Sequence, residues 1–248
     1  ACKINGHYDE AVVGHEPFRQ WVIEDDFVDN CRPDLGLVGV KLVYDVAPFE
    51  QMKLRMLNGA HSAIAYLGSL AGFETVAEAI RDEGIEVFIK GLWREDLSLS
   101  LNAPPETSLE GYAAQLLERF RNPEICHFLE QIAIDGSQKL PQRILAPLFE
   151  NLSAGKPYKR LLVVIAAWLR YIESRSKSGQ PELNDPYQQE LKRAAQKASN
   201  DTALVENILK IAPGYSDLPT HRIADELVEI MFQLGNFRDT ARFEGNLQ

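Results

Sequence analysis

The stretch KLRMLNGAHSAIAYLGSLAG, residues 53–72, combines a buried helix with three polar residues near its beginning. Its second half is apolar at the spacing of one helical face, which predicts a helix packed into a core. At about 100° per residue, Asn58 lies about 140° and His61 about 80° around the helix axis from Lys53. The three polar side chains therefore share one broad face of the predicted helix.

Two interpretations fit these polar residues. In the structural one, Lys53 extends to water, Asn58 hydrogen-bonds a neighbouring helix end, and His61 is a satisfied core histidine. In the functional one, a lysine with a lowered pKa acts as general base, while Asn58 and His61 donate hydrogen bonds to a developing alkoxide. The spacing alone does not choose between them.

Most of the chain after Pro48 has the apolar spacing of helices. Helices are expected at 73–82, 85–101, 108–121, 123–132, from 141 onward, at 159–174, and three times more before the end. Thr107 and Glu110 fit a capping box at the start of one of them. Loops are expected at 135–137 and, as a polar surface excursion, at 177–186.

The first 46 residues differ from the rest. Segments 18–25 and 38–45 are rich in β-branched and aromatic residues, which predicts two short strands joined by a loop. A two-stranded ribbon is marginal in water, so these strands are expected to pair with a sheet elsewhere. The predicted fold class is mainly α, with residues 1–46 as a β-containing connector and residues 47–248 as a helical substrate and catalytic domain.

Composition narrows the function. The net charge of −10 leaves no basic footprint for nucleic acid or an anionic membrane surface, so neither partner is expected. The longest apolar run, 161–169, is far shorter than the roughly 20 residues that span a bilayer. Cys2, Cys31 and Cys126 lack the spacing of a metal site or disulfide framework, which favours a reducing, cytoplasmic location. There is no glycine-rich nucleotide loop.

Three blocks of sequence resemble the mannitol dehydrogenase family, the polyol-specific long-chain dehydrogenases that include fructuronate reductases. The pattern Lys-x4-Asn-x2-His within 53–72 resembles the family signature. EPFRQWVIEDDF (16–27) resembles the segment that joins the family's two domains, and DGSQKLPQR (135–143) resembles a second block. The resemblance implies a multi-helical C-terminal substrate domain, similar to that of 6-phosphogluconate dehydrogenase, with the N-terminal Rossmann domain missing from this chain.

The resemblance also implies an activity. Family members interconvert a polyol or aldonate with its keto sugar, such as D-mannitol with D-fructose or D-mannonate with D-fructuronate, using NAD and no metal. By this resemblance Lys53 is the general base, Asn58 and His61 polarise the reacting oxygen, and Lys139 contacts substrate. Gln131 stands where mannitol-oxidising members have an arginine, which favours hexuronates slightly. NAD is expected to be bound mainly by the absent domain, so the chain alone is expected to be inactive.

Other residues receive structural interpretations. Arg143 lies one turn beyond Lys139 and is assigned no direct role, and His127 is expected to be structural. Trp93 and Trp168 lie on apolar faces and are expected in the core. The alternative to an enzyme is a free-standing helical interaction domain whose Lys, Asn and His are structural. The two strands without a sheet argue against that alternative.

Overall fold

A computed structural model describes residues 2–4, 7–9, 11, 18–215 and 220–234. The chain divides into two compact units, Ala1–Val46 and Ala47–Gln248.

The first unit contains two small sheets. β1 (Cys2–Ile4) pairs antiparallel with β2 (His7–Asp9), and β3 (Val22–Glu24) pairs in parallel with β4 (Lys41–Val43). Short 3-10 turns occupy Val28–Asn30 and Leu35–Val38 between β3 and β4. β3 and β4 lie within the two segments predicted as strands. The β1–β2 pairing was not predicted, because strands of three residues are too short for a sequence pattern to indicate them.

The second unit is helical, which confirms the predicted fold class. Its α-helices are α1 (Ala47–Met52), α2 (Ala60–Ala71), α3 (Val76–Ala79), α4 (Glu83–Gly91), α5 (Leu109–Arg121), α6 (Leu129–Ile132), α7 (Gly136–Leu140), α8 (Ala146–Ser153), α9 (Lys159–Arg175), α10 (Gln188–Lys197), α11 (Asp201–Leu209) and α12 (Thr220–Leu234). Three π-helical turns, η3 (Lys53–Gly59), η4 (Leu92–Leu97) and η6 (Pro141–Leu145), and one 3-10 turn, Ser98–Ser100, interrupt them.

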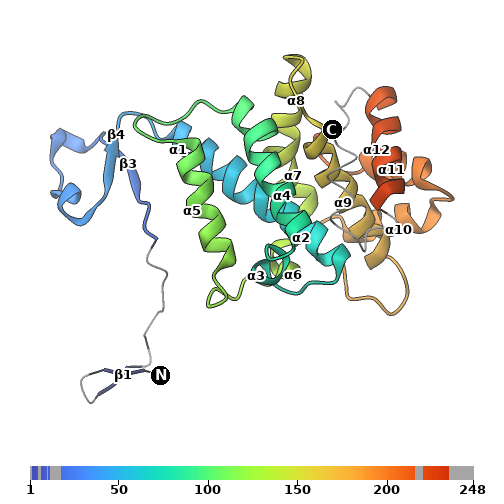
Figure 1. The fold of residues 1–248 in the computed structure, drawn as a ribbon, viewed down its shortest axis with the longest axis horizontal. Coiled ribbons are helices and arrows are strands. Elements are labelled where there is room, and N and C mark those ends of the chain that lie inside the picture. Colours follow the sequence, from blue (N-terminus) through green and yellow to red (C-terminus); the bar gives the residue numbers. More distant parts are fainter. Residues whose placement is uncertain (1, 5–6, 10, 12–17, 216–219, 235–248) are drawn as a thin grey trace. The chain divides into compact units, whose positions relative to one another are not determined.

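Helix α9 forms the centre of the core. Every residue from 161 to 169 is apolar and buried, so the helix is apolar around its whole circumference at that point. α2 packs on one side of α9 and α12 packs against another, as the ribbon shows (Figure 1). Trp93 and Trp168 are buried, as predicted. The core thus fixes α2, the helix that continues from the polar residues at its beginning.

One predicted helix and one predicted helix cap within residues 73–121 differ from the structure. The helix expected at 73–82 is only α3, which begins after Thr75 because Thr75 and Glu78 form the capping box there. α5 is capped by the Ser108 hydroxyl, which accepts from the Gly111 N–H at 3.0 Å, so the capping box expected from Thr107 is not formed.

A third expectation, a helix over 123–132, fails for a tertiary reason. Only Leu129–Ile132 is helical, as α6. The backbone just before it is extended, and the Val76 N–H donates to the His127 carbonyl at 3.0 Å while the Leu129 N–H donates to the Glu74 carbonyl at 2.9 Å. These bonds to the start of α3 replace helical ones.

The loop expected at 135–137 is not found, whereas the loop expected at 177–186 is present and mostly exposed, apart from the buried Leu183 and Asp185. α7 already begins at Gly136, and Ser137 is buried. Its hydroxyl and its backbone N–H donate to the carboxylate of Asp185 at 2.6 and 2.9 Å. Asp185 and Leu183 are therefore buried, because the second segment closes over the beginning of α7.

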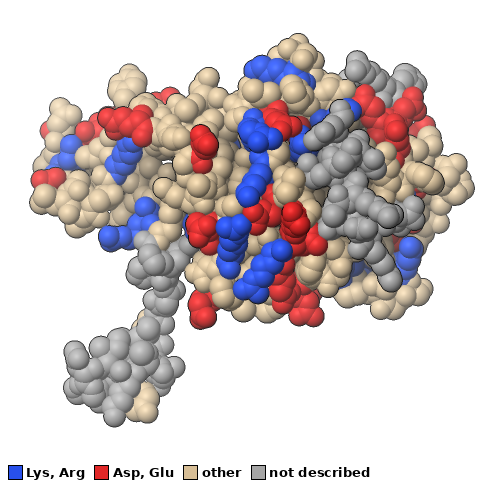
Figure 2. Space-filling view, in the orientation of Figure 1, with Lys and Arg blue, Asp and Glu red and all other residues tan. Residues whose placement is uncertain are grey.

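Charged side chains of opposite sign are mixed on the surface. On the face shown in Figure 2, Lys and Arg lie next to Asp and Glu instead of gathering into one basic patch. Glu86, for example, accepts from Lys90 at 2.5 Å and from Arg121 at 2.6 Å. Within the described ranges, no helix combines the length and apolar character required to cross a membrane.

Candidate active site

Lys53 and Asn58 lie on a π-helical turn, and His61 follows it as the second residue of α2. α1, η3 and α2 form one continuous helix, with the residues on both sides of η3 in right-handed helical conformation. In a π turn each N–H bonds five residues back, so residues five apart lie closer to one side of the helix than they do in an α-helix. Lys53 and Asn58 therefore share one side of the turn. The angle of about 140° assumed α-helical geometry, from which this turn departs.

Contacts from distant parts of the chain hold the π turn. The buried Arg55 guanidinium donates to both carboxylate oxygens of Glu150 on α8, each at 2.6 Å, and to the Ser100 carbonyl. The Trp93 indole N–H donates to the Met56 carbonyl at 2.8 Å. π turns frequently mark functional sites, and this one carries Lys53 and Asn58 and leads into His61, so the beginning of α2 is the candidate active site.

Lys53 and Asn58 keep their hydrogen-bonding groups unused. Lys53 is exposed and Asn58 is half-buried. Neither side chain has a hydrogen-bond partner among the residues that the structure describes, although the Asn58 carbonyl accepts from the Ser62 hydroxyl at 3.1 Å. An ammonium and an amide are thus available to a ligand on the same side of the turn.

His61 is enclosed by other rings and cations. Its ring lies 4.7 Å from Phe120 and 5.7 Å, edge to face, from His127. Burial, followed by the positive charges of His127, Arg143 and Arg119, lowers the His61 pKa to about 3. The imidazole is therefore neutral at ordinary pH. Its Nε2 atom is buried and has no hydrogen-bond partner in the described part of the chain.

The segment DGSQKLPQR (135–143) lies next to the π turn η3. α7 follows Asp135, which has the left-handed φ of 58°. Lys139 on α7 is half-buried, and burial, followed by the charge of Arg143, lowers its pKa against the opposing effects of Asp135 and Asp185. η6 packs against η3, so Lys139 and Arg143 lie on a helix adjoining the π turn.

Arg143 joins the candidate cluster, although the sequence analysis assigned it no direct role. Its Nη1 donates to the Ser62 hydroxyl at 3.1 Å, next to His61. Burial lowers the Arg143 pKa, and its Nε is buried without a partner in the residues described. The available signal was spacing, because residues four apart, such as Lys139 and Arg143, share one helix face. His127, interpreted as structural, also lies at the site through its contact with His61.

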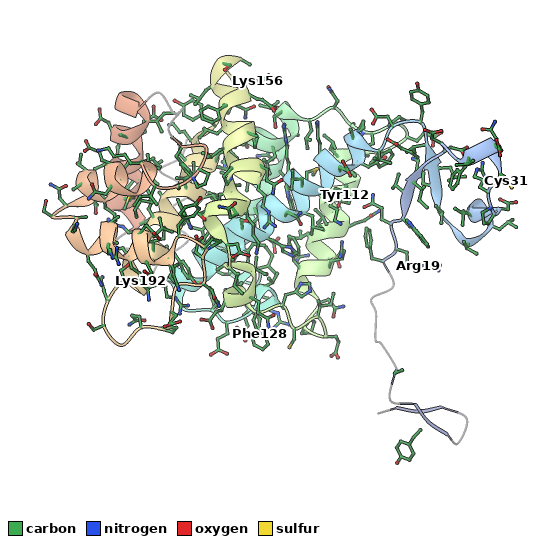
Figure 3. All side chains as sticks on the ribbon, turned by 180° about the vertical axis from the view of Figure 1, so that it is seen from behind. Arg19, Cys31, Tyr112, Phe128, Lys156 and Lys192 are labelled. Atoms are coloured by element: carbon green, nitrogen blue, oxygen red, sulfur yellow. The ribbon has the colours of Figure 1, made fainter. Side chains whose placement is uncertain are left out.

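Gln131 is not brought to this cluster. It is exposed on α6 and lines a pocket of about 560 Å³ together with Phe128, Ser69 and Arg175. Figure 3 shows Phe128 in the segment that leads into α6. None of Lys53, Asn58, His61, Lys139 or Arg143 lines that pocket.

The low His61 pKa predicts a pH-dependent stability. The unfolded chain binds a proton at this histidine below about pH 6.5, whereas the folded chain binds it only near pH 3. The stabilisation from neutral His61 is therefore complete above pH 6.5 and is lost as the pH falls toward 3. Between pH 7 and 5, urea unfolding is expected to show wild type losing up to about 2 kcal/mol more than His61→Gln.

NMR provides the direct check. The His61 imidazole nitrogens, assigned by their absence in His61→Gln, are expected to keep neutral shifts from pH 8 down to pH 5. A titration midpoint above pH 6 contradicts this prediction.

The long helix with its π turn defines a helical domain with an active-site-like cluster, and comparison identifies its family. The model of the mannitol dehydrogenase C-terminal domain matches residues 45–233, so the chain belongs to that family. It is 47% identical over 174 residues to D-mannonate oxidoreductase from Escherichia coli, covering 70% of this chain and 36% of the relative. It is 43% identical over 206 residues to a mannitol dehydrogenase from Saccharomyces cerevisiae, covering 82% and 41%.

A solved structure supports the same family assignment. Mannitol 2-dehydrogenase from Pseudomonas fluorescens, in a ternary complex with NAD and D-mannitol, superposes with a TM-score of 0.79 at 28% identity. The match covers 94% of this chain and 47% of that one. The chain thus spans less than half the length of these relatives.

Proposed function

We propose that this chain is the substrate-binding and catalytic domain of an NAD-dependent oxidoreductase that interconverts a polyol or aldonate with its keto sugar. The observation that carries the proposal is the π turn, which places Lys53 and Asn58 on one side of the helix just before a neutral His61. Within the described residues, the Lys53 and Asn58 side chains and the His61 Nε2 atom have no hydrogen-bond partner. The relatives support it, because their names specify D-mannonate and mannitol as substrates.

Each side chain has a role in this reaction. Lys53 takes the proton of the alcohol as general base, and returns it in the reverse direction. Asn58 and His61 donate hydrogen bonds to the oxygen as negative charge develops on it. A neutral imidazole suits this role, because it donates one N–H without releasing a proton to the alkoxide. NAD, when bound, accepts the hydride.

Lys53, Asn58 and His61 are not the residues that would bind the phosphates of NAD. The chain has no glycine-rich loop of the kind that cradles a dinucleotide, whereas the cluster around the π turn offers groups suited to the reacting oxygen. The residues present therefore fit the nicotinamide side of the site, and we assign the rest of the cofactor to a separate nucleotide-binding domain.

The first unit carries features of a surface that packs on such a domain. Tyr44 is fully exposed and Trp21 is 61% exposed, and Val28, Leu37 and Val38 are exposed as well. Among the residues that the structure describes, the β3–β4 sheet has two strands, so each strand has one edge without a strand partner there. Large apolar side chains and open edges of this kind favour a partner surface, which we assign to the nucleotide-binding domain.

The test uses the two-domain enzyme, meaning this chain preceded by its nucleotide-binding domain, either encoded upstream of Ala1 or taken from the E. coli relative. NADH oxidation is followed with D-fructuronate and with D-fructose in parallel, with the isolated chain as control. We expect the two-domain enzyme to turn over at least one of the two sugars and the isolated chain to turn over neither. Failure on both sugars by an enzyme that binds NADH would overturn the proposed function.

A further inference from the structure

We propose that Arg143 and Lys139 bind the carboxylate of a uronate or aldonate substrate and so select charged sugars over neutral ones. The proposal deepens the proposed function and rests on it, because it assigns a substrate class to the same site.

Lys139 and Arg143 lie together beside the helix formed by η3 and α2. Lys139 lies on α7, one residue before its end, and Arg143 follows four residues later on η6, so both lie on one helix face. The Arg143 Nη1 donates to the Ser62 hydroxyl at 3.1 Å, and that hydroxyl donates to the Asn58 carbonyl at 3.1 Å. Arg143 is therefore connected directly to the helix that carries Asn58 and His61.

No carboxylate of the described residues pairs with either cation. Neither Lys139 nor Arg143 forms an ion pair within the described ranges, although both are partly removed from water. Asp185 is the buried carboxylate nearby, but it already accepts from Ser137 twice and from the Tyr187 N–H at 2.9 Å. Two partly desolvated cations without a paired anion are costly, and a substrate anion would remove that cost.

The unused donors match a carboxylate. On Arg143, Nη1 is bonded to Ser62 and Nε is enclosed, which leaves Nη2 without a partner in the described chain. On Lys139 all three ammonium donors are unused by the described residues. One carboxylate oxygen at Nη2 and the other at the ammonium would use both groups in charge-assisted hydrogen bonds. A neutral hydroxymethyl group at the same place supplies no charge.

The experiment measures specificity in the two-domain enzyme. We determine kcat/KM for D-fructuronate, for D-fructose and for D-fructose 6-phosphate, whose terminal groups are a carboxylate, a neutral hydroxymethyl and a phosphate. Wild type is expected to prefer D-fructuronate. Arg143→Gln is expected to lower its kcat/KM by about 30- to 100-fold, mainly through KM, because a hydrogen bond to a charged group is lost. The kcat/KM for D-fructose is expected to change less than about 5-fold.

Two further variants separate the explanations. Arg143→Lys keeps a cation and is expected to retain part of the preference, and it replaces Arg143→Gln if the latter does not fold. Arg119→Gln is the matched control, because Arg119 on α5 is another cation that lowers the His61 pKa. Arg119→Gln is expected to change kcat/KM by the same factor for every sugar.

The outcomes are distinct. Equal losses on D-fructuronate and D-fructose in Arg143→Gln overturn the proposal, because Arg143 would then only position Ser62 and Asn58. An equal shift of preference in Arg119→Gln also overturns it, in favour of a general positive potential. Preference for D-fructose 6-phosphate makes the bound anion a phosphate. Inactivity of wild type on every sugar defeats the proposed function itself, and this proposal with it.

Discussion

Replacing Lys53 by alanine in the two-domain enzyme is expected to lower kcat by about 10³-fold, within the range for loss of a positioned general base. Lys53 is exposed on the π turn and makes no hydrogen bond to the described residues, so its removal leaves no buried partner unsatisfied. The folded domain and the affinity for NADH are expected to stay unchanged. Single-turnover kinetics and fluorescence titration with NADH measure the two quantities separately.

Lys53→Arg distinguishes a base from a positive charge. Arginine keeps the charge at this place but is not deprotonated in proteins, so it is expected to be as inactive as alanine. Lys192→Ala is the matched control, since Figure 3 shows Lys192 on α10, a different helix from the π turn. Its kcat is expected to equal that of wild type.

The base assignment has a clear point of failure. If Lys53→Ala turned over within 5-fold of wild type, another group would take the proton. If Lys53→Arg kept most of the activity, Lys53 would act as a fixed charge.

The sequence predicted the parts of the fold that local patterns determine. α2, α9 and the three C-terminal helices follow from apolar residues at helical spacing, since such faces must be buried whatever they pack against. The same pattern predicted the helix that carries Lys53, Asn58 and His61. Where apolar spacing is clear and long, the sequence was sufficient.

The π turn was not predictable from its own residues. KLRMLNG contains no proline and reads as ordinary helix, so α-helical angles were assumed. The contacts that hold the turn come from far away, with Glu150 lying 95 residues beyond Arg55 and Trp93 lying 37 residues beyond Met56. A local pattern carries no information about such partners.

Buried polar residues were missed for the same reason. Asp185 lies in a polar stretch that resembles a surface loop, yet it is buried because it accepts from Ser137. Arg143 lies in a helix of mixed character, and only the packing of η6 on η3 shows that it reaches Ser62. Polar residues are exposed on average, but a polar side chain that has a specific hydrogen-bond partner can be buried.

The segment that carries these two cations depends on Gly136, and Gly136→Ala is expected to destabilise the chain by about 3 kcal/mol, at the upper end of the cost of overpacking. A Cβ at this position would overlap the Tyr66 hydroxyl and lie 2.5 Å from the Trp168 Nε1. Neither ring can retreat easily, because both are fully buried. Urea unfolding followed by tryptophan fluorescence measures the loss.

Gly111→Ala is the matched control on the exposed side of α5. Its Cβ would meet only the Ser108 side chain, at 3.5 Å or more, which is ordinary contact. Alanine is the better helix former, so this change is expected to stabilise the chain by up to about 1 kcal/mol. The opposite signs follow from one physical difference: Gly136 lies where two helices touch without room for a methyl group, whereas Gly111 faces water. A Gly136→Ala chain as stable as wild type would mean that α7 does not pack closely on α2 and α9, and the placement of Lys139 and Arg143 beside η3 and α2 would lose its support.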